Sequence, residues 1–236
     1  MLNLSKKILM TLVLTLGMAS YSYADIVLDD FDYSPDLNIN LAVDSGNPLA
    51  TDQRNNVNAL GADVVYDLTY ISGPLEAKAN TFVTLGAGHL ALSNDVGMKS
   101  SLLLTYSELV APGASPVDFS ALSGFYFDLL QSDLGFSILV TIGSGNGADT
   151  STSSTVTGAI GSLTRTNVLF SSFMVGAGTG ANFAAVDYVS VLITSDLESV
   201  DLLLTEFGAT NVPEPTSLAI FGLGLMGLAF SARKKV

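Results

Sequence analysis

The clearest indication of the fold in this chain is the sequence Gly124-Phe-Tyr-Phe-Asp-Leu-Leu130. Successive residues of an extended strand point to opposite faces, so Phe125, Phe127 and Leu129 share one face and the residues between them share the other. One face is apolar and the other is mixed, which is the pattern of a strand that covers a hydrophobic core on one side. The stretch therefore predicts a half-buried strand of an antiparallel sheet.

Similar short runs, rich in β-branched and aromatic residues, recur along the chain between clusters of Gly, Asn, Asp, Ser and Pro. Helical periodicity is scant, and no internal repeat or dividing linker is visible. The more continuous run Ile138–Ile142 predicts a central strand covered on both faces. Many short strands at this spacing predict an all-β protein, an antiparallel β-sandwich or jelly roll. The expected strands are Ile26–Phe31, Asn38–Val43, Val64–Ile71, Thr81–Leu85, His89–Ser93, Ser101–Ser107, Gly124–Leu130, Phe136–Ile142, Thr152–Thr157, Asn167–Phe170, Tyr188–Thr194 and Asp201–Phe207. Between them, Gly143–Thr157 begins as a glycine-rich loop, and Gly176–Gly180 reads as a turn.

The first 24 residues have the pattern of a secretory signal peptide. Two lysines precede the apolar core Ile8–Ala19, and Ser22-Tyr-Ala24 provides the small residues that flank a cleavage site. We expect cleavage between Ala24 and Asp25. An uncleaved membrane anchor is the alternative, but the apolar core has only the length of a signal peptide.

The chain ends in a short polar motif, an apolar segment and a basic cluster. The motif is Val212, Pro213, Glu214 and Pro215, and the basic cluster is Arg233, Lys234 and Lys235. Proline lacks an amide donor and favours extended neighbours, so the motif should be accessible to a processing enzyme. The apolar segment, from 215 to 232, is just long enough for a membrane-spanning helix. Its basic end would stay in the cytoplasm and leave the main domain outside. A buried C-terminal core helix is the alternative, which the basic end disfavours.

This order of motif, segment and basic end resembles the PEP-CTERM sorting signal. The resemblance implies recognition of the Pro-Glu-Pro motif by an exosortase, a membrane-embedded transpeptidase-like enzyme. It also implies export from a Gram-negative bacterium through the export machinery, a transient anchor in the inner membrane, and exopolysaccharide or biofilm matrix as the setting. We therefore expect a signal peptide at 1–24, an exported domain at 25–211 and a sorting signal at 212–236.

The exported portion is strongly acidic. It keeps every acidic residue of the chain except Glu214, but only four basic residues, Arg54, Lys78, Lys99 and Arg165. Such a surface repels the phosphates of nucleic acids and anionic headgroups, so we expect no nucleic-acid partner. Divalent cations, basic partners and neutral polysaccharides are compatible with it, although acidity also serves solubility alone.

Cysteine and tryptophan are absent. Without cysteine, disulfides, thiolate nucleophiles and thiolate-bound metals are excluded, so the domain must be stabilised by burial of its core. His89 is the single histidine, and no nucleophile-elbow pattern accompanies it. No acidic pair is singled out for glycosidase chemistry. We therefore expect no catalytic residues and a protein that is not an enzyme.

Three segments resemble those of β-jelly-roll carbohydrate-binding modules, namely Val27–Phe31, Asp118–Asp128 and Val200–Phe207. The resemblance implies a β-sandwich with the potential to bind glycans. It also implies a structural calcium between the first and last strands, as jelly-roll modules often have. The missing tryptophan departs from many sugar-binding members.

Acidic residues crowd the start of the exported portion, at Asp25, Asp29, Asp30, Asp32 and Asp36. Dense carboxylates suit Ca²⁺, which takes six to eight oxygen ligands. A calcium shared between the first and last strands would use Asp29 and Asp30, with Glu206 from the last strand. A solvated acidic edge that discourages strand-to-strand aggregation is the alternative.

These observations lead to one expected function and two alternatives. We expect a non-enzymatic, exported protein of the cell surface or extracellular matrix, structural or adhesive, with weak glycan contact through Tyr and Phe. The alternatives are a carbohydrate-binding module proper and a glycan-active enzyme.

Overall fold

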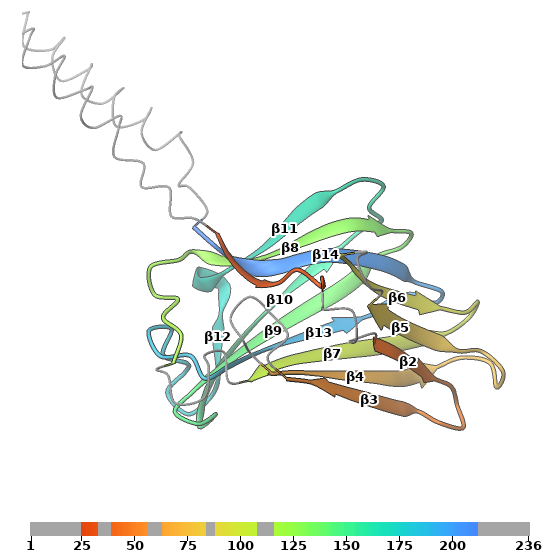
Figure 1. The fold of residues 1–236 in the computed structure, drawn as a ribbon, viewed down its shortest axis with the longest axis horizontal. Coiled ribbons are helices and arrows are strands. Elements are labelled where there is room, and N and C mark those ends of the chain that lie inside the picture. Colours follow the sequence, from red (N-terminus) through yellow and green to blue (C-terminus); the bar gives the residue numbers. More distant parts are fainter. Residues whose placement is uncertain (1–24, 33–38, 56–62, 84–87, 108–115, 212–236) are drawn as a thin grey trace, which may run out of the picture. The chain divides into compact units, whose positions relative to one another are not determined.

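The described part of the exported portion consists mainly of β-strands and the turns between them (Figure 1). The computed structural model describes residues 25–32, 39–55, 63–83, 88–107 and 116–211. The described strands belong to one unit, Asp25–Thr210. Within these ranges, no helix is long and apolar enough to cross a membrane. The signal peptide and the sorting signal that the sequence predicts lie outside the described residues.

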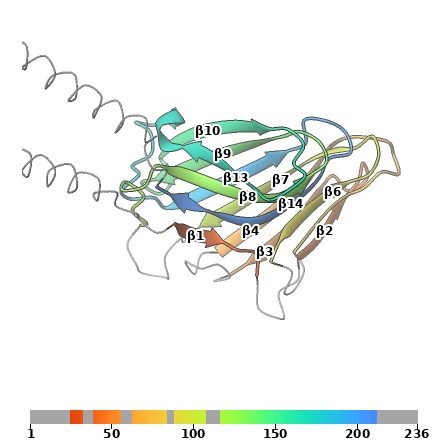
Figure 2. The ribbon, with the colours of Figure 1, turned by 90° about the horizontal axis from the view of Figure 1, so that it is seen from above.

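Two antiparallel sheets face each other, and Figure 2 shows them from a second side. Sheet A has the strand order β11-β8-β14-β6-β5-β2, with β1 also paired to β14. Its strands are β1 (Ile26–Asp29), β2 (Ile39–Val43), β5 (Ala79–Val83), β6 (Leu90–Asn94), β8 (Gly124–Ser132), β11 (Thr164–Leu169) and β14 (Asp201–Thr210). This architecture confirms the predicted all-β, antiparallel β-sandwich.

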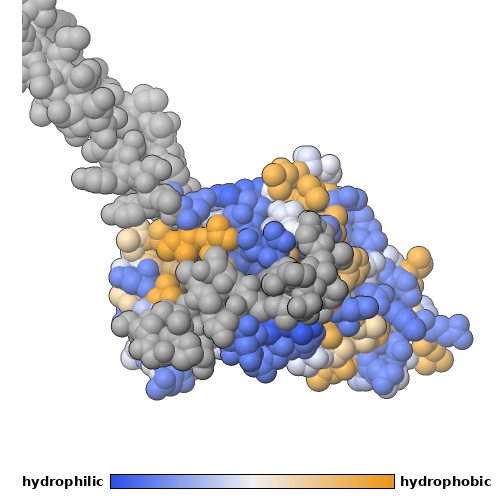
Figure 3. Space-filling model, viewed as in Figure 1, coloured by the Kyte–Doolittle hydropathy of each residue, from blue (hydrophilic) through white to orange (hydrophobic). Residues whose placement is uncertain are grey.

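Sheet B has the strand order β12-β10-β9-β13-β7-β4-β3. Its strands are β3 (Leu49–Arg54), β4 (Asp63–Ser72), β7 (Lys99–Ser107), β9 (Phe136–Ser144), β10 (Asp149–Thr157), β12 (Met174–Ala177) and β13 (Tyr188–Thr194). A short 3-10 helix, Phe170–Ser172, links β11 to β12. On the face seen in Figure 3, hydrophilic residues predominate between separate hydrophobic patches.

The core lies between the two sheets and is rich in phenylalanine. Phe125, Phe127 and Leu129 of β8 are fully buried, as the alternation predicts. Phe207 of β14 stacks on Phe127, with ring centroids 4.8 Å apart. Its ring also lies 5.4 Å from that of Tyr106 on β7, which joins the aromatic residues of the two sheets.

The sequence pattern does not predict β3 and β12, the two edge strands of sheet B. β3 reads Leu-Ala-Thr-Asp-Gln-Arg and has no buried residue, and all four residues of β12 are exposed. An edge strand pairs on one side only and needs no apolar face, so its residues carry little of the pattern that identifies a strand. The last two residues of β12 also lie in the stretch Gly176–Gly180, which the sequence predicts to be a glycine-rich turn.

The outer face of β9 corrects a second prediction. β9 lies inside sheet B, between β10 and β13. Its residues Ile138, Val140 and Ile142 are buried, but Leu139 between them is 36% exposed. The strand is therefore covered on one face only. Continuous apolar sequence does not distinguish a strand between two layers from one whose outer face carries leucine.

Candidate functional site

The first and last strands of the domain, β1 and β14, pair with each other. β1 runs antiparallel to the end of β14, with Ile26 opposite Ala209 and Val27 opposite Gly208. The Thr210 hydroxyl, at the end of β14, donates a hydrogen bond of 2.5 Å to Asp25 Oδ1. The residue that follows the expected signal-peptide cut is therefore bonded to the last strand of the domain.

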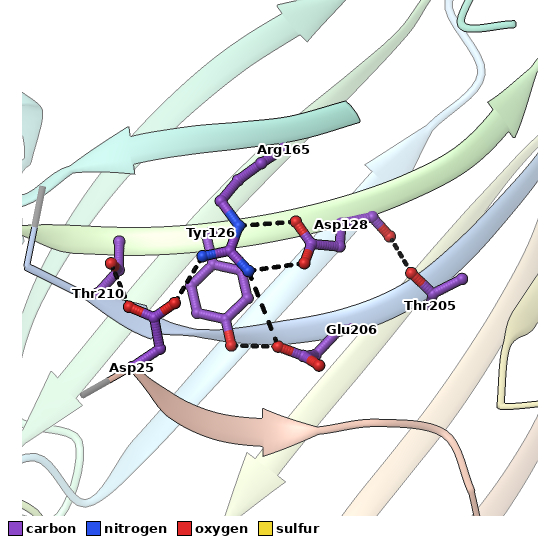
Figure 4. Close-up of polar contacts among 7 residues, drawn as sticks. All are labelled: Asp25, Tyr126, Asp128, Arg165, Thr205, Glu206 and Thr210. Atoms are coloured by element: carbon purple, nitrogen blue, oxygen red, sulfur yellow. Dashed lines mark hydrogen bonds and ion pairs between the residues drawn. The ribbon is translucent and has the colours of Figure 1, made fainter. Parts of the chain in front are cut away.

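Tyr126 forms the base of a polar cluster beside this contact (Figure 4). It lies on β8 directly opposite Gly208 of β14. A Cβ atom on Gly208 would lie 2.6 Å from Cε1 of Tyr126 and 2.5 Å from the Ile26 carbonyl oxygen, so only glycine fits beneath the ring. The Tyr126 hydroxyl donates to Glu206 of β14. Burial raises the pKa of Tyr126, and the bond to Glu206 adds to this, so the hydroxyl stays protonated.

Arg165 of β11 covers the other side of the tyrosine ring. Its guanidinium carbon lies 3.8 Å from the ring centroid of Tyr126, a cation–π contact. Nε and Nη2 bind the two carboxylate oxygens of Asp128 at 2.8 and 2.7 Å. Nη1 binds Asp25 Oδ2 at 2.6 Å, and Nη2 lies 4.0 Å from Glu206 Oε1. The bonds to Asp128, followed by those to Asp25, raise the pKa of Arg165. One cation thus joins three carboxylates that come from three segments of sheet A.

We call this set of residues the seam cluster. Thr205 completes it by donating from its hydroxyl to the backbone oxygen of Asp128 at 2.8 Å. The members drawn in Figure 4 are Asp25, Tyr126, Asp128, Arg165, Thr205, Glu206 and Thr210.

Replacing Arg165 with glutamine should weaken the sandwich modestly and in a salt-dependent way. The Arg165 side chain is 39% exposed, so solvent screens its ion pairs, and we expect a loss of about 1 kcal/mol in the free energy of unfolding. Urea unfolding at low and high salt measures this loss. The difference in unfolding free energy between the wild type and Arg165→Gln should become smaller as the salt concentration rises. Arg54→Gln is the matched control, because Arg54 pairs with Asp52 of its own strand.

The same comparison has a defined pH dependence. The hydrogen bond from Thr210, followed by the contacts with Arg165, lowers the pKa of Asp25 from its ordinary value of 3.8. A carboxyl whose pKa is lower in the folded state stabilises fully above its unfolded pKa and loses that contribution as the pH falls through its folded pKa. The advantage of the wild type should therefore be constant near neutrality and shrink below pH 3.8. Two results would contradict a seam cluster held together by the charge of Arg165. One is a difference in unfolding free energy between the wild type and Arg165→Gln that stays constant at low pH. The other is an equal loss of stability in Arg54→Gln.

The structure separates the predicted calcium ligands. Asp29 lies opposite Phe207 and is fully buried. Its Oδ2 accepts a 3.1 Å hydrogen bond from the hydroxyl of Tyr106 in sheet B, so the carboxylate points between the sheets. Glu206 precedes Phe207 in β14 and bonds to Tyr126 on the outer face. Alternation along the strand puts the two carboxylates on opposite sides of sheet A.

Asp30 does not join either of them through a contact that the structure records. It is exposed, and its Oδ1 accepts the backbone amide of Asp32 at 3.1 Å. Among the described residues, no three His, Asp or Glu side chains are grouped so that they could hold a metal ion. The trio Asp29, Asp30 and Glu206 is therefore not assembled into a calcium site.

The remaining predicted site residues divide into two groups. Asp25 lies in the seam cluster, and the others lie outside the described residues, namely Ala24, Val212, Pro213, Glu214, Pro215, Arg233, Lys234 and Lys235. No feature of the sequence connects Asp25 with Arg165. The available signal was composition, since Arg165 is one of only four basic residues in an acidic domain.

A shallow groove of about 210 Å³ lies on sheet A, away from the seam cluster in the register of the strands. Phe82 of β5 and Ala91 of β6 line it, followed by Leu203 of β14 and Gln131 of β8. Their pairing places these four residues in one row across the sheet. Asp201 and Ser93 add polar groups.

Comparisons with known proteins found one matching sequence motif and several similar solved structures. The model of the PEP-CTERM protein-sorting motif matches residues 211–235. No curated protein sequence matches the chain. Among solved structures, the chain is similar to the Family 11 Carbohydrate-Binding Module from Clostridium thermocellum in complex with a beta-1,3-1,4-mixed-linked tetrasaccharide, at 13% identity and TM-score 0.43, over 81% of this chain and 98% of that one. It is also similar to the solution structure of CtCBM11, at 16% identity and TM-score 0.46, over 84% and 100% of the two chains. An exo-beta-agarase matches at 14% identity and TM-score 0.40, over 81% of this chain and 25% of that chain.

Fold and motif together define the class of this protein as an exported β-sandwich. The chain carries a PEP-CTERM protein-sorting motif at its C-terminal end, which implies processing by an exosortase.

Proposed function

We propose that this protein is a non-catalytic structural or adhesive component of the cell surface or extracellular matrix. The observation that carries the proposal is the contact between Asp25 and Thr210 at the β1–β14 pair. Both processing signals adjoin this one pair of strands in the sequence. Both signals thus join the domain at neighbouring strand ends, which suits a module displayed through a single attachment.

The seam cluster supports a role without catalysis. The carboxylates of Asp25 and Asp128 are bonded to Arg165, and that of Glu206 accepts the Tyr126 hydroxyl. Groups held in this way stabilise the fold and are not presented to a substrate. The strong acidity of the domain serves solubility outside the cell.

The test measures location and activity separately. Antibody labelling of intact cells and isolated matrix should find the wild-type protein outside the cell. The purified, processed protein should release no reducing ends from matrix polysaccharide. Exclusive recovery from the periplasm would overturn the proposed location. Release of reducing ends that is lost when one acidic residue becomes an amide would overturn the non-catalytic role.

Carbohydrate binding is the second candidate function, and the groove on sheet A favours it. Phe82 is 36% exposed there, and the polar side chains of Gln131 and Asp201 line the same groove. An apolar ring with a few polar groups is a common lining for small-molecule sites. Saturable binding on a glycan array, weakened by Phe82→Ala, would support this function.

A further inference from the structure

The outer face of sheet B carries no charged side chain over a large part of four described strands. These parts are Ser101–Ser107 of β7, Tyr188–Thr194 of β13, Ser137–Gly143 of β9 and Thr150–Val156 of β10. The exported domain around this face has a large excess of acidic residues. Charge is therefore concentrated elsewhere, and this face differs in chemistry from the rest of the domain.

Hydroxyl groups form a continuous row across this face. Thr105 of β7 lies opposite Ser190 of β13, which lies opposite Thr141 of β9, which lies opposite Thr152 of β10. Each alternates with buried neighbours, so each points outward. Within the described residues, no side-chain hydrogen bond occupies these four hydroxyls. Each can both donate and accept a hydrogen bond.

Two further rows run parallel to the first. Leu103, Leu192 and Leu139 lie opposite one another in register on β7, β13 and β9. Beyond them, the same strands carry a second hydroxyl row, Ser101, Thr194 and Ser137. Neighbours within a row are about 4.8 Å apart, and rows are separated by about 7 Å along the strands. An apolar strip is thus flanked on both sides by hydroxyls.

Tyr188 adds an aromatic surface at the end of β13. It lies opposite Gly143 of β9, and a Cβ atom on Gly143 would lie 1.9 Å from Cε1 of the Tyr188 ring. The ring therefore lies low across the neighbouring strand, as Tyr126 does over Gly208 on sheet A. Arg165 covers the ring of Tyr126, which is fully buried, whereas Tyr188 is half-buried. Within the described residues, no ring or cation contact covers Tyr188.

We propose that this face binds an uncharged polysaccharide, with the chain running along β13 from the leucine row, over the first hydroxyl row, to Tyr188. Apolar faces of the sugar rings would lie on the leucines and Tyr188, and sugar hydroxyls would bond to the flanking Ser and Thr rows. Short, β-branched threonine side chains lose little rotamer freedom on binding. The inference rests on the proposed function, because it names what the displayed module contacts.

Charge and area favour this partner over the two nearest rivals. An anionic polymer would be repelled by the surrounding acidic surface. A second copy is equally acidic, and the face spans only about 20 by 24 Å, or roughly 500 Å², from the strand spacings. A stable protein–protein interface buries about 800 Å² on each partner. One polymer chain needs only a strip of such a face.

The test is affinity electrophoresis of the processed protein in gels that contain mixed-linkage β-glucan, galactan or xylan, with alginate as the anionic control. We expect retardation by at least one neutral polysaccharide and none by alginate. Leu139→Asp should weaken retardation at least tenfold. Leu130→Asp is the matched control, since Leu130 is similarly exposed, at 41%, but lies on the other sheet. It should bind as the wild type does.

Two milder variants keep the inference falsifiable if an aspartate disturbs the fold. Thr141→Val removes one hydroxyl without changing shape, and Tyr188→Ala removes the ring, and each should weaken retardation severalfold. Loss of binding in Phe82→Ala, with these variants unaffected, would assign binding to the groove and overturn the inference. So would failure of the three neutral polymers to retard the wild type, or a dimer in sedimentation that Leu139→Asp dissociates. Surface location is measured independently, so the proposed function can stand when this inference fails.

Discussion

Alanine in place of Pro213, Glu214 and Pro215 should abolish C-terminal processing while leaving export intact. The two prolines keep the peptide extended and free of competing backbone hydrogen bonds, which a processing site requires. Alanine favours helix and would extend the apolar helix predicted to follow. The matched motif at 211–235 implies processing by an exosortase, so we expect an all-or-none effect.

Intact-mass measurement of the exported protein checks this prediction. The wild type should lack residues beyond the motif, and the triple variant should retain the chain through Val236. Pro74→Ala, at an exposed proline outside the motif, should be processed normally. Normal processing and location of the triple variant would show that the motif is not the address. A wild type that keeps Val236 would contradict cleavage.

Phe207→Ala should cost about 3–5 kcal/mol in the free energy of unfolding, the largest expected loss of stability. The Phe207 ring is fully buried and stacks on Phe127 at 4.8 Å. It also contacts Phe125 at 5.6 Å and Tyr106 of the opposite sheet at 5.4 Å. Removing it deletes a large apolar area and leaves a cavity between the sheets, since close-packed neighbours relax only in part.

Urea unfolding measures this loss, and Phe82→Ala provides the control. Phe82 is also a phenylalanine on sheet A, but it is 36% exposed on the outer face, so its truncation leaves no enclosed cavity. We expect its loss to be a small fraction of that of Phe207→Ala. If both variants lost the same unfolding free energy, the contacts of Phe207 across the core would not be the main source of its contribution to stability.

The sequence pattern was a good guide to strands that cover the core. All twelve expected strands overlap observed ones, because the alternation of apolar residues on strands such as β8 follows directly from burial of one face. β3 and β12 were missed because edge strands need no such pattern. The outer face of β9 was misassigned because leucine occurs on exposed faces as well as buried ones.

The candidate sites depended far more on pairing. Residues 25, 128, 165 and 206 belong to four separate segments, and only the register of β1, β14, β8 and β11 brings them together. The predicted calcium ligands are separated for the same reason. Neighbouring strands do bring Asp29 close to the end of β14, but the register opposes it to Phe207, on the inner face, and leaves Glu206 on the outer one.

The class of fold, the acidity of the exported domain and the C-terminal sorting motif can be read from the sequence alone. These properties depend on composition and on local patterns of a few residues. They can be read without knowing how the strands pair. The contacts of Arg165 with Asp25 and Asp128, and the alignment of the hydroxyl and leucine rows on sheet B, follow from the pairing of the strands in the folded domain. A strand reveals which of its residues share a face, but not which residue of another strand lies beside them. That register is set by long-range packing across the whole sandwich.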